Sequence, residues 1–245
     1  MSYEVSVVLC TINERDSLEK IFDALERSAT FTYEIIVVDD GSTDGTKELI
    51  VDYSNKHTNC KYIFHDSKSS LLIADYAGIK NADGKFIIKM DADMQHPPEK
   101  IKDIFNKLLD GYDIVVASRY ADGGSTGNRK AIRGLISRVA EFLARILIRN
   151  ANLTTDPLSG FFGFRRGLNL NIDEKWRGHK TLLFLLASNP GVVVSEIPYR
   201  FNERSVGESK IVNGLDFIIS YMRELILVKK VEMKSRKVQI LQRKQ

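Results

Sequence analysis

Short, mainly apolar runs alternate along the first half of the chain with longer segments in which apolar residues recur every three or four positions. The runs are 5–11, 33–42, 60–66, 85–93 and 112–120. A short apolar run bounded by turn residues is typical of a strand buried on both faces, and the longer spacing is typical of a helix with one apolar face. We therefore predict an α/β fold with a mostly parallel sheet that is covered by helices on both sides.

The segments between these runs carry the signals of helices. They are 15–29, 43–57, 71–84 and 97–111. In the first segment Leu18, Ile21 and Leu25 have the spacing of one helix face, and Thr43 or Asp44 can cap the second. Ligands of such sheets bind at the carboxyl ends of the strands, so the residues that follow the apolar runs are the candidates for a site.

The second half of the chain is organised differently. In order, it contains a basic amphipathic helix (129–150), a turn-rich loop (154–167), a strand (192–201), a polar loop (202–210), an apolar helix (211–228) and a basic tail (229–245). No internal repeat or low-complexity linker separates the two halves. We therefore predict one domain over residues 1–228, followed by the tail.

Composition narrows the class of protein. The 245 residues carry a formal net charge of +4, which is too small to indicate a nucleic-acid partner. The two cysteines form neither a disulfide framework nor a zinc pattern, and they fit a reducing compartment. We see no secretion leader at the start, and no window of about 18 residues is free of charge. We therefore expect a cytoplasmic protein without a membrane-spanning helix.

The fourth predicted strand ends in two aspartates, Asp91 and Asp93, with only Ala92 between them. In an extended chain residues i and i+2 point the same way, so the two carboxylates repel each other unless a cation lies between them. Oxygen ligands suit Mg²⁺ or Mn²⁺, and Gln95 continues the same phase with an amide oxygen. Two other interpretations stay open: acids that favour the next helix start, or a glycosidase pair, which adjacent positions suit poorly.

Further polar residues lie at other strand ends and in the second half. Asp39 ends the second strand in an acid–acid–glycine–serine sequence, which is either a simple turn or a contact for a base or ribose. Arg119 ends the fifth strand, Arg133 lies near the start of the long helix, and Arg204 and Lys210 flank the polar loop. Guanidinium groups match phosphate oxygens bidentately, so a cation with several converging arginines predicts a site for more than one phosphate.

Six motifs occur in an order that is typical of one family. They are "VVLCTINERDSL", "VVDDGSTDGT", "MDADMQHPPE", "ASRY", "DPLSGFFGFRR" and "ERSVGESK". The chain resembles the inverting family 2 glycosyltransferases of the GT-A fold, a Rossmann-like sheet flanked by helices. Within that family it is similar to dolichyl-phosphate mannose synthases and related polyprenyl-phosphate glycosyltransferases, and the "GESK" loop is the most specific sign of this branch. The resemblance covers about residues 4–228.

The resemblance implies a site for a nucleotide-sugar donor. Contacts to the nucleoside would come from Thr11, Asn13, Glu14 and Asp39. The divalent metal, Mg²⁺ or Mn²⁺, and the sugar diphosphate would be held by Asp91, Asp93 and Gln95. Two departures from the family affect this site: "CTINE" (10–14) stands where the family usually reads Pro-Thr-Tyr-Asn-Glu, and "SLLIADYAG" (70–78) replaces a glycine-rich stretch. The base and sugar therefore stay open between GDP-mannose and UDP-glucose.

The resemblance also implies a lipid acceptor, a polyprenyl or dolichyl monophosphate. Arg119 and Arg133 would bind phosphate groups of donor and acceptor, and Arg204 would close over the same charges, with Lys210 in the same loop. Many relatives carry C-terminal transmembrane helices, which we do not expect in this chain. It is more similar to the chains that work with a small membrane-anchoring subunit in some organisms.

A lipid acceptor requires contact with a membrane surface. The segments 129–149 and 211–228 are the candidates for helices that lie in the interface, because apolar residues at helical spacing are flanked by basic ones in the first. In the tail, seven basic residues face a single glutamate, a net charge of +6 that favours anionic lipid. The alternatives are a helix packed on the sheet and a solvated tail. We expect peripheral attachment on the cytosolic face.

Two other functions stay open. A transferase of the same fold could act on a saccharide hydroxyl, and it would need a carboxylate base such as Asp156. A different class is a nucleotide-sugar-binding subunit without activity, which the intact acids and arginines disfavour. The histidines, including His96 beside the acids, are interpreted as structural.

Overall fold

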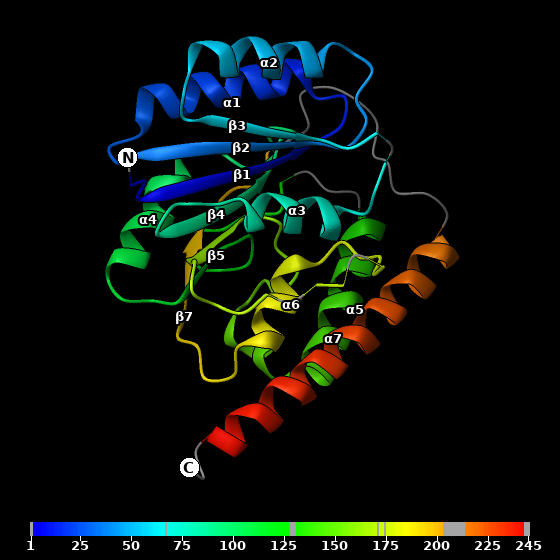
Figure 1. Ribbon diagram of the computed structural model, residues 1–245. Helices are drawn as coiled ribbons and strands as arrows, with labels where there is room; N and C mark the ends of the chain where they lie inside the picture. The colour runs from blue at the N-terminus through cyan, green and yellow to red at the C-terminus, as the bar shows by residue number, and fades with distance from the viewer. Residues whose placement is uncertain are drawn as a thin grey trace.

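The computed structural model (Figure 1) describes residues 2–66, 68–127, 131–170, 172–173, 175–202 and 214–242, with the backbone alone for 131–135 and 214–217. A sheet lies between two layers of helices, and the C-terminal helix crosses one end of the molecule as a long diagonal rod. The predicted α/β class is confirmed. Within the described residues, no helix combines the length and the apolar character needed to cross a bilayer.

The sheet has seven strands in the order β3-β2-β1-β4-β6-β5-β7. Their bounds are β1 Val5–Thr11, β2 Tyr33–Asp39, β3 Cys60–Phe64, β4 Phe86–Asp91, β5 Ile114–Ser118, β6 Phe162–Arg165 and β7 Val194–Pro198. β1 pairs in parallel with β2 and β4, and β2 pairs in parallel with β3, so the carboxyl ends of these strands reach the same edge. β6 runs antiparallel to β4 and β5, between which it lies.

Helices cover both faces of the sheet. Their bounds are α1 Arg15–Ser28, α2 Thr46–Lys56, α3 Leu71–Lys80, α4 Lys100–Leu109, α5 Ala131–Leu147, the 3₁₀ helix η1 Arg149–Leu153, α6 Thr181–Ser188 and α7 Gly214–Gln242. One core joins α1, α2 and α4 to one face, and the other core joins α3, α5, α6 and α7 to the opposite face. β1 is buried at every position, which explains its uninterrupted apolar sequence. Both cysteines are buried and free.

The segment 154–167, which the sequence predicts as a turn-rich loop, contributes a strand. Phe162–Arg165 forms β6, and its two phenylalanines are almost fully buried. At Gly163 an added Cβ would lie 2.4 Å from Ile104 Cγ2 of α4, so a glycine is needed for α4 to pack closely on the sheet. The prediction was wrong here because the proline and the glycines that punctuate this stretch hide a short strand.

Two helices also differ from their sequence patterns. α6 is buried at all eight positions, so it has no polar face and no helical periodicity by which to recognise it. The apolar pattern predicts that the last helix ends at 228, but α7 continues through much of the predicted tail to Gln242. Glu232 of α7 accepts a backbone N–H at the start of η1 at 2.8 Å, and Gln239 donates to the Pro190 carbonyl at 3.0 Å. These contacts hold the basic segment against the body of the protein.

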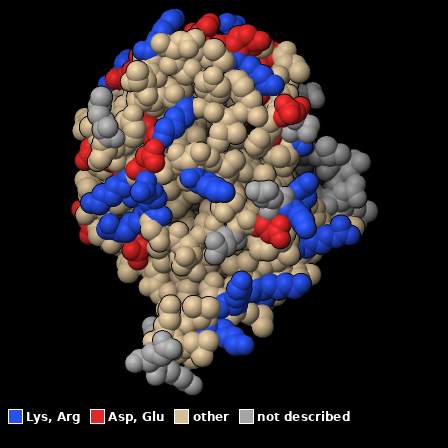
Figure 2. Space-filling model, viewed as in Figure 1, with Lys and Arg blue, Asp and Glu red and all other residues tan. Residues whose placement is uncertain are grey.

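α5 and α7 direct apolar side chains outward. On α5, Ala140 and Ala144 are buried, whereas Phe142 and Ile146 are 62% and 63% exposed. The exposed apolar residues of α7 are Ile218, Ile219, Ile226, Met233, Val238, Ile240 and Leu241. Figure 2 shows blue Lys and Arg side chains along the lower part of α7. The outer faces of the two helices therefore combine apolar and basic side chains.

Candidate active site

The carboxyl ends of β1, β2 and β4 bring three predicted site residues to one edge of the sheet. In the register of the sheet, Thr11 lies opposite Asp39 and Cys10 lies opposite Asp91. These residues lie at one edge because the three strands are parallel, so that their carboxyl ends are all at the same edge of the sheet. The structure thus brings together side chains that are far apart in the sequence.

Asp39 and Thr11 each have a buried oxygen without a partner in the part of the chain that the structure describes. Asp39 is fully buried, and its Oδ1 accepts the backbone N–H groups of Gly41 (3.2 Å) and Ser42 (3.0 Å). Within the described ranges no donor reaches its Oδ2 or Thr11 Oγ1, and Thr11 is 3% exposed. Buried polar atoms are almost always hydrogen-bonded, so these two oxygens, on residues that lie opposite each other in the sheet, indicate a place for a ligand with hydroxyl or amide groups.

The loops after β1 and β2 are fastened to each other by hydrogen bonds between side chains and backbone. The N–H of Asn13 donates to Ser42 Oγ at 2.8 Å, and Asn13 Oδ1 accepts the N–H of Thr43 at 2.8 Å. The N–H of Glu14 donates to Thr46 Oγ1 at 3.3 Å. Asn13 has φ 53°, a left-handed conformation that asparagine tolerates better than most residues. The predicted nucleoside loop therefore has a fixed backbone.

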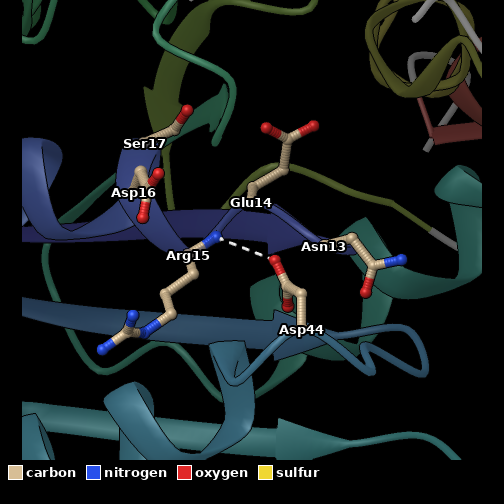
Figure 3. A pocket seen from close by; sticks show the side chains of 6 residues that line it. All are labelled: Asn13, Glu14, Arg15, Asp16, Ser17 and Asp44. Atoms are coloured by element: carbon tan, nitrogen blue, oxygen red, sulfur yellow. Dashed lines mark hydrogen bonds between the residues drawn. The ribbon is translucent and has the colours of Figure 1, made fainter. Parts of the chain in front are cut away.

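A small pocket lies where these loops meet the first turn of α1 (Figure 3). Its lining residues are Asn13, Glu14, Arg15, Asp16, Ser17 and Asp44. The N–H of Arg15 donates to Asp44 Oδ2 at 3.4 Å, while the carboxylate of Glu14 points away from Asp44. Although partial burial raises the pKa of Asp44, hydrogen bonds from Thr46 and from the Arg15 N–H lower it overall. Asp44 is therefore an ionised anchor of the loop, and its bonds explain why α1 and α2 begin side by side.

Asp91 ends β4, and both of its oxygens are engaged. Lys89 Nζ lies 2.5 Å from Oδ1, and His96 Nε2 lies 3.2 Å from Oδ2. Burial raises the pKa of Asp91, but the Lys89 ammonium and the contact with His96 outweigh it and hold the pKa well below its usual range. Burial likewise lowers the pKa of Lys89, yet the carboxylates of Asp75 and Asp91 outweigh it and raise that pKa. The buried ammonium of Lys89 and the partly exposed carboxylate of Asp91 therefore form a charge pair at the end of the strand.

The next residues form a tight turn beside Asp91. Met94 has φ 59°, and Asp93 Oδ1 accepts the N–H of Gln95 at 3.1 Å. The Gln95 side chain donates through Nε2 to the Asn202 carbonyl at 3.3 Å, and the N–H of Asn202 donates to the Gln95 carbonyl at 3.0 Å. The Gln95 amide oxygen is left as an acceptor. Left-handed non-glycine residues are uncommon and cluster at functional sites, so this turn supports a binding role.

The donor set around Asp91 and Asp93 fits a divalent metal that is shared with a substrate. Among the described residues, no group of three or more His, Cys, Asp and Glu side chains is arranged to hold a metal by itself. Mg²⁺ is usually bound by one or two carboxylates together with substrate phosphates and water, so a complete protein cage is not required. Gly160 keeps one side of Asp91 open, because an added Cβ there would lie 2.8 Å from Asp91 Oδ2.

Arg119 is held by a buried carboxylate. Its Nε and Nη2 each donate to an oxygen of Asp156 at 2.6 Å, and Asp156 is fully buried. Burial lowers the pKa of Arg119, but the bonds to Asp156 outweigh it and raise that pKa. The rings of Tyr120 and Phe201 lie 5.4 and 5.8 Å from the guanidinium carbon. Asp156 is therefore the anchor of Arg119, and it does not present a carboxylate base to an acceptor as the saccharide-hydroxyl alternative requires.

Three predicted phosphate-binding side chains lie outside the described residues. They are Arg133, of which only the backbone in α5 is described, and Arg204 and Lys210, which fall within 203–213. Their contacts with the site stay a prediction. Asn202, the last described residue before Arg204, is bonded to Gln95 of the acidic turn.

Lys89, Asp75 and His96 touch the site but were not foreseen in this role. The sequence interpretation treats His96 as a helix-start residue and does not single out the other two. A signal was present for Lys89, because a lysine inside an otherwise apolar strand, two positions before Asp91, requires a buried counter-charge. No comparable signal marks Asp75, whose partners come from other elements of the fold.

Comparison with known proteins gives the family context. Residues 6–176 match the family described as glycosyl transferase family 2. The chain is 36% identical over 230 residues to the dolichol-phosphate mannosyltransferase of Pyrococcus furiosus, which covers 94% of this chain and 64% of that protein. It is 32% identical over 238 residues to the dolichol-phosphate mannosyltransferase of Saccharomyces cerevisiae, which covers 92% of this chain and 86% of that protein. The chain therefore spans somewhat less than two thirds of the Pyrococcus relative.

A solved structure gives the fold context. The fold matches glucosyl-3-phosphoglycerate synthase of Mycobacterium tuberculosis, solved with Mn²⁺, UDP-glucose and phosphoglyceric acid, with a TM-score of 0.66 at 18% identity. The match covers 93% of this chain and 78% of that chain. At this identity the likeness concerns the fold alone, and it confirms the predicted GT-A arrangement.

Proposed function

Because the chain belongs to glycosyl transferase family 2, we propose that it transfers a hexose from a nucleoside-diphosphate sugar to a polyprenyl or dolichyl monophosphate. The main structural support is the pair of buried oxygens on Thr11 and Asp39 that have no partner among the described residues, at the same edge of the sheet as Asp91 at the end of β4. The names of the Pyrococcus and Saccharomyces relatives support mannose as the sugar and a dolichol-type phosphate as the acceptor. GDP-mannose is therefore the first donor to test, and UDP-glucose is the second.

In this proposal, the donor lies along the ends of β1, β2 and β4. Asp39 Oδ2 and Thr11 Oγ1 accept or share hydrogen bonds with the nucleoside, and the fixed loop at Asn13 supports it. Asp91, Asp93 and Gln95 would hold Mg²⁺ or Mn²⁺, which supplies positive charge for the diphosphate leaving group. The residues of the chain thus fix the position of the donor before the bond to its sugar breaks.

The acceptor oxygen belongs to a phosphate, which is already ionised at neutral pH. It attacks the sugar carbon as the bond from that carbon to the donor diphosphate breaks, so the configuration inverts and no strong base is needed. Two anions must approach each other, and the positive charge of Arg119, fixed by Asp156, lowers the cost of that approach. Arg133, Arg204 and Lys210 are proposed to add charge on the same side.

The lipid acceptor requires a membrane surface, and we assign that contact to the outer faces of α5 and α7. Phe142 and Ile146 on α5 and Ile226 on α7 are more than half exposed, and apolar residues with basic neighbours favour an anionic interface. The proposal places the protein peripherally on a cytosolic membrane face and includes a small membrane-anchoring subunit as a partner. In this proposal residues 1–228 act as one catalytic domain, and the basic segment after residue 228 adds electrostatic attraction to anionic lipid.

The decisive experiment is transfer of label to lipid. Purified protein, polyprenyl phosphate in detergent, and Mg²⁺ or Mn²⁺ are incubated in parallel with labelled GDP-mannose and UDP-glucose. Label in the organic extract from one donor identifies the reaction and the sugar together. Label that appears only in a water-soluble saccharide, or nowhere while nucleotide still binds, contradicts the lipid-phosphate acceptor.

Membrane contact has its own test, which is sedimentation with anionic liposomes at low salt. The double variant F142E/I146E should bind liposomes about tenfold more weakly, because each change removes an exposed apolar group that would enter the lipid and adds a charge that anionic lipid repels. Leu109 on α4 is 53% exposed and provides the control L109E, which should bind as the parent does. Equal binding of all three proteins would place the membrane contact elsewhere.

A further inference from the structure

Lys89 is a buried cation directly below the proposed metal site. Along β4, Phe86, Ile88 and Met90 belong to the core on the α1 and α4 side, whereas Ile87 belongs to the opposite core. The alternation of a strand therefore directs Lys89 and Asp91 to the same face as Ile87. The Lys89 side chain is only 1% exposed. Burial of a lysine without a structural gain is unfavourable, so its position so close to Asp91 needs a reason.

Asp75 of α3 holds Lys89 in place. Asp75 Oδ2 lies 3.5 Å from Lys89 Nζ and accepts the Thr181 hydroxyl at 2.5 Å, and Asp75 Oδ1 accepts the Cys10 thiol at 3.0 Å. Asp75 is 1% exposed, so these donors from β1, β4 and α6 surround it. Its carboxylate is thus built into the interior as a counter-charge and is not offered to a ligand.

Lys89 donates a hydrogen bond to Asp91 Oδ1, an oxygen that could otherwise coordinate a metal. Its ammonium lies 2.5 Å from Asp91 Oδ1, and His96 contacts Oδ2 from a cage of Phe161, Tyr199 and Phe201 rings. A divalent cation bound to Asp91 would therefore lie close to the ammonium of Lys89, and the two positive charges would repel each other. The ammonium of Lys89 is thus shared between two carboxylates, those of Asp75 and Asp91.

We propose that Lys89 is a positioning residue that weakens the hold of Asp91 on the divalent cation, so that the cation binds well only together with the diphosphate of the donor. The inference rests on the proposed function, because it takes Asp91, Asp93 and Gln95 as the cation site. Lys89 keeps Asp91 oriented, and Asp75 tunes the strength of that interaction. The consequence is that the site gains its cation with the substrate and releases it with the nucleoside diphosphate.

The test is direct titration of Mn²⁺, in which electron paramagnetic resonance reports the free ion, with and without GDP or UDP. K89M should bind Mn²⁺ about tenfold or more tightly without nucleotide, because a nearby positive charge is removed. D75N should shift the affinity in the opposite direction, because Lys89 then acts on Asp91 alone. The gain in Mn²⁺ affinity caused by nucleotide should be smaller in K89M than in the parent protein.

Matched variants keep the inference falsifiable. K85M makes the same change at an exposed lysine near the other end of β4 and should leave Mn²⁺ binding unchanged. If K89M does not fold with Asp75 unpaired, the double variant D75N/K89M is compared with D75N and should bind Mn²⁺ more tightly. Affinities within twofold across these proteins overturn the role of Lys89. Absence of Mn²⁺ binding by the parent chain with both nucleotides overturns the proposed cation site itself, a distinguishable failure.

Discussion

Asp39 and Asp91 end the two strands that flank β1, and each has a lysine nearby, Lys47 at 3.9 Å and Lys89 at 2.5 Å, yet their carboxylates are engaged to different extents. Asp39 keeps one oxygen without a donor among the described residues, whereas Lys89 and His96 occupy both oxygens of Asp91. Asp156 resembles Asp91, because Arg119 takes both of its oxygens. The free oxygen of Asp39 can accept a hydrogen bond from a ligand. Asp91 and Asp156 instead orient the side chains of Lys89 and Arg119. Substitutions at the three acids measure this difference.

The largest effect should come from Asp91→Asn. The change removes a charge from the proposed cation site and leaves Lys89 without its nearer partner, so the rate of hexose transfer should fall about a thousandfold. The measurement is kcat/KM for label transfer at saturating Mn²⁺. Asp103→Asn, at an exposed site on α4, is the control and should retain full activity. Retention of turnover within threefold in Asp91→Asn would remove Asp91 from the reaction.

Asp156→Ala should act mainly on stability. Removal of one partner of a buried ion pair leaves the Arg119 guanidinium without compensation, and the free energy of unfolding should fall by about 3 kcal/mol. Urea denaturation measures it, with Asp110→Ala as the control, since that exposed pair with Lys107 contributes less than about 1 kcal/mol. Unchanged stability combined with lost transfer would instead favour Asp156 as a base for a hydroxyl acceptor.

Asp39→Asn should weaken nucleotide binding. The amide can replace the acceptor that serves Gly41 and Ser42, but its NH₂ group cannot accept a hydrogen bond from a nucleoside. The dissociation constant for GDP or UDP should rise about thirtyfold, or ~2 kcal/mol, in calorimetric titration. Equal affinity in the variant would show that the spare oxygen faces no ligand, and the contrast between Asp39 and Asp91 would lose its functional meaning.

Thr11→Val should have the smallest effect. Valine preserves the shape of threonine and removes only a hydroxyl that no other described residue contacts by a hydrogen bond. Nucleotide affinity should therefore fall about fivefold, or ~1 kcal/mol, and stability should hold or rise slightly. The same calorimetric titration measures the nucleotide affinity. A double variant that combines Thr11→Val with Asp39→Asn shows whether Thr11 Oγ1 and Asp39 Oδ2 contact the same group of the nucleotide. Losses that add fully would assign them to separate contacts.

The sequence predicts the first half of the fold well. β1, β2 and β4 are covered by short apolar runs, and the rule for parallel sheets places their terminal acids at one edge before any coordinates are known. Thr11, Asp39 and Asp91 meet there as expected. The physical reason is that strands buried on both faces leave a continuous apolar signal in the sequence.

The rest depends on tertiary contacts that no local pattern carries. β6 is hidden by the glycines in and around it, of which Gly163 serves the packing of α4, and α6 has no polar face that would give it a helical period. The Lys89 and Asp75 pair joins a strand to a helix, and only their packing shows that each needs the other. Asp156, which binds the Arg119 guanidinium, likewise lies in a loop that is distant from Arg119 in the sequence.

β6 has a consequence for how the protein is made on the ribosome. Because β6 lies between β4 and β5, the four strands β3-β2-β1-β4 have no neighbour on the β4 side until the chain has been synthesised past Arg165. A nascent chain that stops earlier exposes an unpaired strand edge next to the nucleotide half, which is a hazard for aggregation. The joining of β4 to β5 is thus timed by β6, the one reversed strand among those described, and truncations before Phe162 should be far less soluble than those after Pro198.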